Sequence, residues 1–548
     1  MKKYALLTAV LLVLSVLLTF AACTPPEPAP EPDPFEQYRK ADDFTYYREM
    51  KMNADKKLYV FGKSENLTGP QKIAAEAVQG IFARTNAKYY YYRNNYTVWT
   101  DDMTANYGIT FEEVTFAEML ADYKNVYGDK YVLYDGVNNP QSLNCASTIA
   151  GAEDMLPVDV QLEEYVRSLG FTMGEDATTM TEAKCFKKYK DKLNNDALVQ
   201  INYGGFNDQM RDYGIACKYL FLWPKDMEDP DIVRFRAEAL AWAKEDSPVF
   251  GWVPNDETID VSIASNYSKY TLASDYCTNM SVFTCKNAFG DLTFRQNHKT
   301  TDVVAEKGKH YVCIMMSDGD NVQTWYNNFA TNSKYLGAER GEFAMGWSMQ
   351  PSLTDLAPNI MNYVYSRADK NDYYVCSVSG QGYMNPQNYG ALGSFIGGLD
   401  LYMKRADLSV VQILDAGPSK NVIDMYSLVP SLSGGIYCYG MKYAEGAGSV
   451  YWANNKPFVS IRETLWSANV EAMAARINGY DTDPTSITGY TAINLHPWSM
   501  DYNDVKQLVS LLDEHVVVVT ADDFIRLVTS NVPHTDVTLP YTDYSVAA

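Results

Sequence analysis

The chain is short of positive charge. Its 548 residues include 46 lysines and arginines against 68 aspartates and glutamates, a formal net charge of −22. A protein that binds nucleic acid or an anionic membrane surface normally carries a basic footprint. We therefore exclude nucleic acid as a partner, and we expect no contact with a membrane through the folded body.

The motifs of common metal and cofactor chemistry are also missing. The five histidines include no HExxH motif and no pair four residues apart, which argues against a zinc site. There is no P-loop, no GxGxxG and no G-x-S-x-G; Gly346–Gln350 comes nearest to the last but lacks its final glycine. Asp318-x-Asp320 begins like a calcium loop, yet the later ligand positions do not follow. We expect neither a metal nor a cofactor.

Paired cysteine motifs are absent too. Beyond Cys23 there are eight cysteines, none in a CxxC spacing, and most have apolar neighbours, as in Tyr-Val-Cys313-Ile-Met. This pattern favours buried free thiols on strands over a disulfide framework or a thiolate zinc site.

Only one long apolar run exists, at the start of the chain. Met1-Lys2-Lys3 precedes the run from Ala5 to Phe20, and Ala21-Ala22-Cys23 follows it. That layout predicts a secretory signal over residues 1–22. The end of the run resembles a bacterial lipobox, with Phe20 where leucine is usual, so we expect Cys23 to be lipidated and the protein to be anchored outside the cytoplasm. The alternative is an ordinary cleaved signal with an incidental cysteine.

The next segment, Thr24–Pro34, alternates proline with acidic residues. Such a segment forms neither an α-helix nor a β-sheet and behaves as an extended spacer. Residues 23–35 are therefore predicted to be a lipidated cysteine with a tether.

The remaining chain is too long for one core, so at least two domains are expected. Residues 36–300 form an irregular α/β region, which we expect to hold two or three small subdomains. From 301 to 548, strand-like apolar runs alternate with segments of helical period. These runs are His310–Ser317, Glu342–Met349, Tyr373–Gly380, Leu408–Asp415, Gly435–Gly440, Pro457–Thr464, Thr491–His496 and Val516–Thr520.

Eight strands that alternate with helices predict a (β/α)8-like, TIM-type barrel. The connection Met441–Asn455 looks like loop, which leaves an incomplete barrel open. The fold class expected is thus α/β, with a C-terminal barrel after small α/β domains.

Ionisable and aromatic side chains follow several of these runs. In a barrel the strand ends converge on one face, where the βα loops build the active site. The candidates at these ends are Asp318, Asp320, Asn321, Tyr383, Asp415, Arg462, Glu463, Trp466, His496 and Trp498.

Carboxylates together with aromatic rings suit sugar chemistry. Glycosidic cleavage needs one carboxylic acid and one carboxylate roughly 5 to 9.5 Å apart. Asp318 and Asp320 on one loop, with Glu463 on a distant strand, are the predicted catalytic groups. The other residues of the set are predicted to bind substrate, with Trp466, Tyr383 and Trp498 stacking on sugar rings and Arg462 keeping Glu463 ionised.

Structural explanations compete with these roles. Asp318–Asn321 is also a turn signal, and His496 is equally suited to a hydrogen-bonded structural role. Asp522-Asp523 is read as the start of a helix. Arg462 and Glu463 are adjacent, so on a regular strand only one of them faces the site.

Several stretches resemble one known family. Gly380-Gln-Gly-Tyr-Met-Asn-Pro386 is similar to the motif that names the GxGYxYP glycoside hydrolase family, with Asn385 where the second tyrosine belongs. Further similar stretches are Ser317–Asn321, Gln79–Arg84, Asn144–Gly151, Gly251-Trp252 with Glu257, and Val518–Phe524. The resemblance implies small N-terminal domains before a barrel-like domain, and sugar processing, but it assigns no catalytic residue.

The sequence therefore predicts an extracytoplasmic glycoside hydrolase that acts on an oligo- or polysaccharide. A non-catalytic glycan-binding lipoprotein and another polysaccharide-active enzyme, a lyase or an esterase, are the alternatives.

Overall fold

The structure is a computed structural model that describes residues 33–298, 302–327, 340–535 and 539. The predicted signal, Cys23 and most of the tether lie outside the described residues. The chain divides into two units, Met1–Gln37 and Tyr38–Ala548, and everything below concerns the second.

Three small parallel sheets precede residue 300. Their orders are β2-β1-β3, β5-β4-β6 and β10-β9-β7-β8. The strands are β1 (Lys57–Phe61), β2 (Tyr89–Tyr91), β3 (Thr110–Glu113), β4 (Lys130–Tyr134), β5 (Leu156–Asp159), β6 (Thr172–Asp176), β7 (Leu198–Gln200), β8 (Leu220–Leu222), β9 (Ser247–Gly251) and β10 (Lys269–Ala273). The helices are α2 (Gly69–Ala83), α3 (Thr97–Tyr107), α4 (Phe116–Tyr127), α5 (Ser142–Glu153), α6 (Glu163–Ser168), α7 (Glu182–Tyr189), α8 (Arg211–Ala216), α9 (Pro230–Trp242), α10 (Glu257–Asn266), α11 (Met280–Phe283) and α12 (Lys286–Phe289).

Helix starts follow from local sequence. Thr68 caps α2: its hydroxyl accepts from the Gln71 amide, and the Gln71 side chain accepts from the Thr68 amide in return. This capping box satisfies two amide groups that the first helical turn leaves free. Asp256 caps α10 through the amide of Ile259, and so determines where Glu257 begins that helix.

The C-terminal part contains one large curled sheet. Its strands are β11 (His310–Met316), β12 (Met345–Met349), β13 (Asp372–Cys376), β14 (Val410–Asp415), β15 (Gly434–Tyr439), β16 (Val450–Ala453), β17 (Lys456–Ser460), β18 (Glu463–Leu465), β19 (Tyr490–Leu495) and β20 (Val516–Val518). The helices are α13 (Val322–Tyr326), α15 (Leu353–Leu356), α16 (Pro358–Tyr365), α17 (Leu392–Ala406), α18 (Lys420–Ser427), α19 (Val470–Asn478), α20 (Tyr502–Ser510) and α21 (Ala521–Asn531). Each of the eight predicted runs contains a strand, and β11 to β14 are buried along their whole length, as parallel strands covered on both faces are.

The strand order departs from a complete TIM barrel. The order is β16-β17-β15-β14-β13-β12-β11-β19-β18, so the seventh run, β19, pairs directly with the first, β11. The eighth run, β20, pairs with the first half of β11, at Tyr311 and its two neighbours. It lies on the same side of β11 as β12, which pairs with the last two residues of that strand. The chain from β17 to β18 contacts β15 through the amide of Ile461 and β19 through the amide of Arg462. The sheet is therefore a curled, barrel-like α/β sheet, and the (β/α)8 order is not present.

Two further expectations can be compared with the structure. The connection Met441–Asn455, which looked like loop, contains β16, an antiparallel partner of β17. All eight cysteines beyond Cys23 are buried free thiols, as predicted, although only Cys313, Cys376 and Cys438 lie on strands. None of the helices described is long and apolar enough to cross a bilayer.

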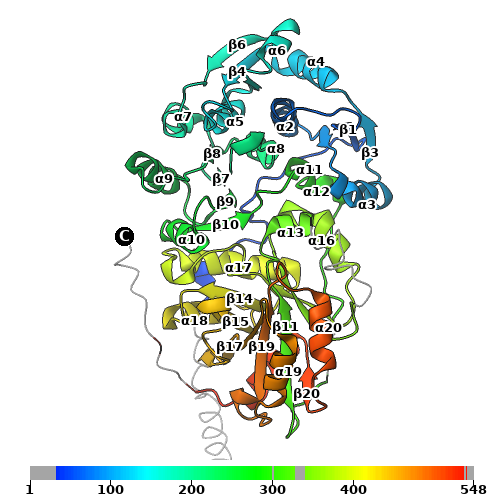
Figure 1. Ribbon diagram of the computed structural model, residues 1–548, viewed down its shortest axis with the longest axis vertical. Helices are drawn as coiled ribbons and strands as arrows, with labels where there is room; N and C mark the ends of the chain where they lie inside the picture. Colours follow the sequence, from blue (N-terminus) through cyan, green and yellow to red (C-terminus); the bar gives the residue numbers. More distant parts are fainter. Residues whose placement is uncertain (1–32, 299–301, 328–339, 536–538, 540–548) are drawn as a thin grey trace, which may run out of the picture. The chain divides into compact units, whose positions relative to one another are not determined.

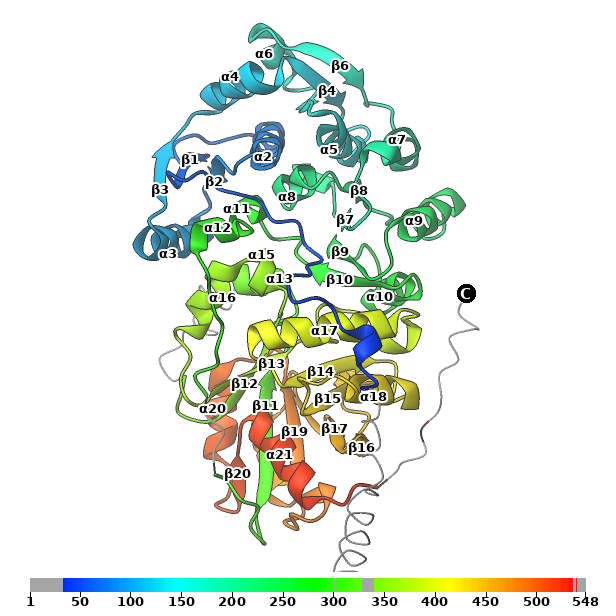
Figure 2. The ribbon, with the colours of Figure 1, turned by 180° about the vertical axis from the view of Figure 1, so that it is seen from behind.

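The third small sheet packs against the C-terminal part through α17. Figures 1 and 2 show α17 lying between β10 and the curled sheet, and Phe395 of α17 packs edge-on against Tyr270 of β10. Thr271 of β10 exchanges two backbone hydrogen bonds with Tyr383, in the loop after β13. Residues far apart in the sequence thereby meet beside the strand ends.

Candidate active site

A cavity of about 360 Å³ opens where β11, β14, β15 and β19 end, and we call it the candidate cavity. Parallel strand ends, where side chains of several loops converge, are the usual place for such a site. It is lined by Trp252, Glu257, Ser317, Asp318, Asp320, Asn321, Gln323, Val378, Tyr383, Gln412, Leu414, Cys438, Tyr443, Trp466, Asn494, His496 and Trp498. Seven of the predicted site residues, namely Asp318, Asp320, Asn321, Tyr383, Trp466, His496 and Trp498, are thus brought together.

Asp318 is held in a constrained loop directly after β11. Its φ of 65° lies in the left-handed region, which a non-glycine residue adopts at a cost. A Cβ on the following Gly319 would lie 1.6 Å from the carbonyl oxygen of Ser348, so only glycine fits there. The Asp318 carboxylate accepts from the Ser317 hydroxyl at 2.6 Å and from the Trp498 indole nitrogen at 3.0 Å. Two donors aimed at one carboxyl group suit a carboxylate anion.

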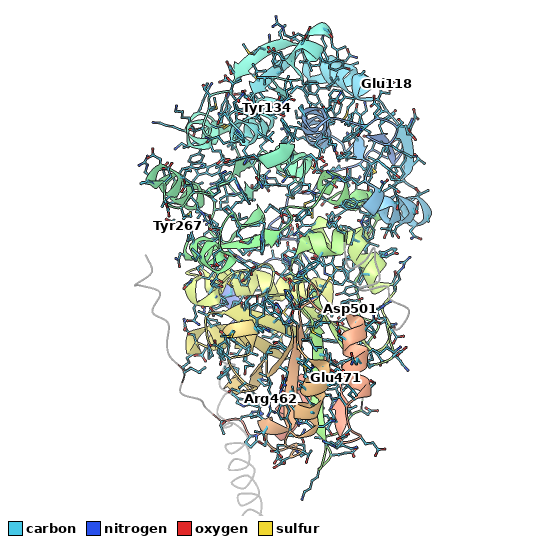
Figure 3. All side chains as sticks on the ribbon, viewed as in Figure 1. Glu118, Tyr134, Tyr267, Arg462, Glu471 and Asp501 are labelled. Atoms are coloured by element: carbon cyan, nitrogen blue, oxygen red, sulfur yellow. The ribbon has the colours of Figure 1, made fainter. Side chains whose placement is uncertain are left out.

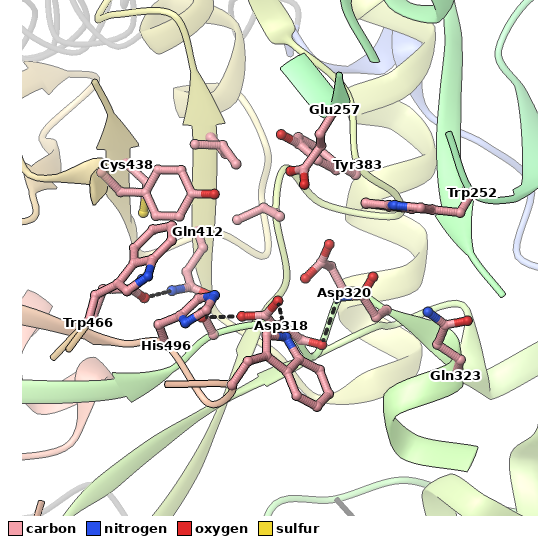
Figure 4. A pocket seen from close by; sticks show the side chains of 17 residues that line it. Trp252, Glu257, Asp318, Asp320, Gln323, Tyr383, Gln412, Cys438, Trp466 and His496 are labelled. Carbon is pink, nitrogen blue, oxygen red and sulfur yellow. Dashed lines mark hydrogen bonds between the residues drawn. The ribbon is translucent and has the colours of Figure 1, made fainter. Parts of the chain in front are cut away.

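Two further carboxyl groups share the cavity, as Figure 4 shows. Burial, followed by the charges of Asp318 and Glu257, raises the pKa of Asp320 well above its usual value. Burial also raises the pKa of Glu257; a hydrogen bond from Tyr383 opposes this, and the charge of Asp318 adds to it. Like charges that share a site disfavour each other's ionised form, which is how paired carboxyl groups come to serve as acid and base.

The Gly380–Pro386 loop forms the wall beside Glu257. Gly380 has φ +138°, which L side chains rarely adopt, and a Cβ on Gly382 would lie 2.2 Å from the Tyr270 ring. Both glycines are therefore required by the backbone path that brings Tyr383 beside Glu257 in the lining of the cavity. Asn385, which replaces the family's second tyrosine, donates to the Ser262 hydroxyl at 2.5 Å and takes no part in the lining.

Aromatic rings form the opposite wall. Trp466 stacks on His496, with 4.1 Å between ring centroids and 8° between planes, and Tyr443 packs against Trp466. Nδ1 of His496 lies 3.0 Å from the Ser499 hydroxyl. Trp498 is 50% exposed, although its indole nitrogen is bound to Asp318. Flat, partly exposed rings beside carboxyl groups can stack on the apolar faces of sugars.

The predicted placement of Glu463 in this pocket is wrong. Its carboxylate accepts two hydrogen bonds from Arg476 of α19, at 3.0 and 2.7 Å, and one from the Tyr480 hydroxyl. Glu463 is 8% exposed and turned toward the helices outside the sheet. The strand alternation leaves Glu463 on the outer face, while Trp466, three residues later, lies in the cavity.

Arg462 and Asp415 also lie outside the candidate cavity. The Arg462 guanidinium packs over the Tyr480 ring at 3.6 Å and donates to the Thr488 carbonyl, so it does not pair with Glu463. Asp415 is buried at the end of β14, where it accepts from the Tyr437 hydroxyl at 3.2 Å and from the Ala416 amide at 2.8 Å. Burial raises the pKa of Asp415 to about 7.

The most important residue that the strand-end argument missed is Glu257. It starts α10, next to a different sheet, so no argument from the ends of the C-terminal strands could reach it. The available signal was its place downstream of Gly251-Trp252 in the family resemblance. Tyr443 was missed because it lies in the connection that looked like loop.

One group in the described part of the chain has the ligand types and spacing for a metal ion, formed by His298, Asp522 and Asp523. It lies at the first turn of α21, where Asp522 accepts from His298 at 3.2 Å and from the Thr520 hydroxyl at 2.6 Å. Asp522 and Asp523 thus lie at a helix start, as predicted, and none of the three lines the candidate cavity.

Four profiles of one family match successive parts of the chain: the GxGYxYP first domain at 57–125, the second at 129–193, the third at 196–285, and the "GxGYxYP putative glycoside hydrolase C-terminal domain" at 308–529. A crystal structure described as "a putative hydrolase from Bacteroides thetaiotaomicron" superposes with a TM-score of 0.79 at 24% identity, over 90% of this chain and 99% of that chain. That likeness shows a shared fold. No curated protein matches the chain. Because the four domain profiles match in order, and the loop that carries the naming motif forms a wall of the candidate cavity, the chain belongs to the GxGYxYP family.

Proposed function

We propose that the protein is an extracytoplasmic glycoside hydrolase in which Asp320 is the general acid and Asp318 the catalytic carboxylate. The observation that carries this assignment is the meeting of three carboxyl groups, Glu257, Asp318 and Asp320, in one cavity lined with aromatic rings. Glycosidic cleavage needs one protonated and one ionised carboxyl on either side of the scissile bond.

Asp320 suits the acid role because burial, followed by the charges of Asp318 and Glu257, raises its pKa well above the usual value, as a general acid requires. It would deliver its proton to the glycosidic oxygen as the bond to the anomeric carbon breaks. The resulting ionised Asp320 would then recover a proton from the water that completes hydrolysis.

Asp318 suits the other role because its carboxyl group lines the cavity and accepts two hydrogen bonds, from Ser317 and Trp498. It would stabilise the developing positive charge at the anomeric carbon, by attacking that carbon or by activating the water that does so. Glu257 would act through Asp320, since its charge helps to raise the pKa of that group. Trp466 and Trp498 would hold the sugar ring by stacking.

Placement outside the cytoplasm belongs to the same proposal. The signal at residues 1–22 and the lipobox-like Cys23 support a lipid anchor, with Thr24–Pro34 as the spacer between lipid and enzyme. A tethered enzyme of this kind would meet polysaccharide at the cell surface.

The test is to incubate the purified protein from Thr24 onward with a panel of oligosaccharides and to measure the reducing ends released. We expect release from at least one member, and loss of release in Asp318→Asn and Asp320→Asn. Binding of a glycan with no release from any panel member would replace this proposal with a glycan-binding role, and full activity in both variants would refute the assigned pair.

A further inference from the structure

The candidate cavity continues into two others. A middle cavity of about 440 Å³ shares the side chains of Gln323 and Trp498 with it. A distal cavity of about 580 Å³ shares Arg93, Gln209 and Tyr276 with the middle one. Since neighbouring cavities have side chains in common, they lie side by side, and we call the three together the groove, which leads from the carboxyl groups toward the first and third small sheets.

The two most exposed aromatic side chains in the described residues both lie on this groove. Trp498 is 50% exposed and Tyr276 is 60% exposed. Single exposed rings are common on protein surfaces, but two on one continuous groove indicate a binding surface. Exposed aromatic rings spaced along a groove are the feature by which proteins hold extended chains of flat units.

The backbone that carries Tyr276 is firmly held. Its amide donates to Oε1 of Gln323 at 2.7 Å, and its carbonyl accepts from the Tyr96 hydroxyl and from Nδ2 of Asn327, both at 3.3 Å. Gln323 lies in the first turn of α13 and Asn327 is its C-cap residue, directly downstream of the loop that carries Asp318 and Asp320. The backbone from which the exposed ring projects is therefore tied to the helix that follows the two aspartates.

The distal cavity supplies polar partners. Its wall contains the amides of Asn202 and Asn207 and the ion pair between Arg93 and Asp208, whose atoms are 2.7 Å apart. One carboxylate oxygen of Asp275, another wall residue, is buried without a hydrogen-bond partner in the described part of the chain.

We propose that the substrate is a polysaccharide, which runs from the candidate cavity across Trp498 and Tyr276 into the distal cavity. This inference rests on the proposed function and adds chain length to it. An enzyme that removes units from short sugars has no use for binding surface beyond its cavity, whereas remote contacts along a chain supply binding energy to the reacting unit.

The experiment compares Tyr276→Ala with Tyr267→Ala on disaccharides and octasaccharides of xylose, glucose and mannose linked as in the common plant and fungal polysaccharides. Tyr267 is a matched control because it is 36% exposed, follows α10 and lines none of the three cavities; Figure 3 shows it at the surface. We expect wild-type kcat/KM to rise with chain length. Tyr276→Ala should lower kcat/KM for the octasaccharide by about three- to tenfold, the effect of one stacking ring, and leave the disaccharide unchanged. Tyr267→Ala should change neither.

The outcomes separate this inference from the proposed function. If the wild type hydrolyses octasaccharide and disaccharide equally well, or if Tyr276→Ala affects both alike, the groove does not hold substrate even though the enzyme is a hydrolase. If nothing is hydrolysed, calorimetric titration decides: tighter binding of an octasaccharide than of its disaccharide, weakened by Tyr276→Ala alone, supports the groove and rejects the hydrolase. Binding that does not depend on chain length, or no binding, rejects the groove.

Discussion

The side chain of Tyr383 lies beside the carboxyl group of Glu257 in the candidate cavity, as Figure 4 shows. The contact joins the loop after β13 to the first turn of α10, the helix that connects β9 and β10 of the third small sheet. The candidate cavity is thus completed by a residue from outside the C-terminal part. The contact between Tyr383 and Glu257 also gives the tyrosine of the family motif a physical role, because it lies against a carboxyl group that shares the cavity with Asp318 and Asp320.

Asp320→Asn should abolish activity without destabilising the protein. Loss of a general acid typically costs about 10²-fold or more in turnover. The raised pKa of Asp320 means that its ionisation opposes folding, and this penalty appears as pH rises above the ordinary aspartate pKa of about 4. The melting temperature of Asp320→Asn should therefore exceed that of the wild type at neutral pH, with a smaller difference under acid conditions.

Scanning calorimetry at several pH values measures this difference, and Asp513→Asn, at an exposed aspartate, is the matched control. A variant that keeps full activity, or that melts lower at neutral pH, would contradict the assignment.

Glu257→Gln should change the pH profile of activity. The charge of Glu257 helps to raise the pKa of Asp320, so its removal lowers that pKa. A general acid must be protonated to act, and activity falls on the alkaline side as it ionises. The alkaline limb of kcat/KM should therefore move to lower pH in Glu257→Gln. An unchanged limb together with unchanged turnover would show that Glu257 does not act on the acid.

Glu463→Gln should affect stability and not catalysis. The side chain is buried against Arg476 and Tyr480, outside the candidate cavity. Because Arg476 is half exposed, loss of the pair should lower the free energy of unfolding by only about 1 to 2 kcal/mol. Urea unfolding and turnover measure the two effects, with the exposed Glu471→Gln on the same side of the sheet as control. A large loss of turnover with unchanged stability would show that Glu463 takes part in catalysis.

Gly382→Ala should destabilise the junction between the third sheet and the C-terminal part. Its new methyl group would overlap the buried Tyr270 ring, and such overpacking costs about 1 to 3 kcal/mol. Turnover should fall as well, because the loop carries Tyr383. Gly390→Ala in the same loop is the control, since its nearest neighbour would be the Ser268 hydroxyl at 3.5 Å. Equal melting temperatures for both variants would show that the loop shifts freely.

Cys23→Ala should release the protein from the membrane. If Cys23 carries the lipid, cell fractionation should find the wild type in the membrane fraction and the variant in the medium. Shortening Thr24–Pro34 should leave the melting temperature unchanged, since no core can form from so many prolines. Full-length wild-type protein that is already soluble in the medium would refute the lipid anchor.

The amino-acid sequence by itself determined the local features. The eight apolar runs each contain a strand because long stretches of buried side chains form parallel strands whatever their partners are. The Asp318, Tyr383 and His496 segments reach one cavity because the ends of parallel strands converge on one side of a sheet. Each of these inferences needs only neighbours along the chain.

Tertiary structure alone decided the rest. Strand pairing joins residues far apart in sequence, so no local pattern could show that β19 lies directly beside β11 and that β20 takes the other edge. Glu463 and Trp466 lie near one strand end, and strand alternation separates their faces, but only the tertiary structure shows which face meets the cavity and that Glu463 pairs with Arg476 of α19. Glu257 enters the cavity from a separate sheet because β10 and α17 bring that sheet against the loop of Tyr383. Which residues make up the site thus depends on how the domains pack. Domain packing is determined by contacts between residues far apart in the sequence, and such contacts produce no recognisable sequence pattern.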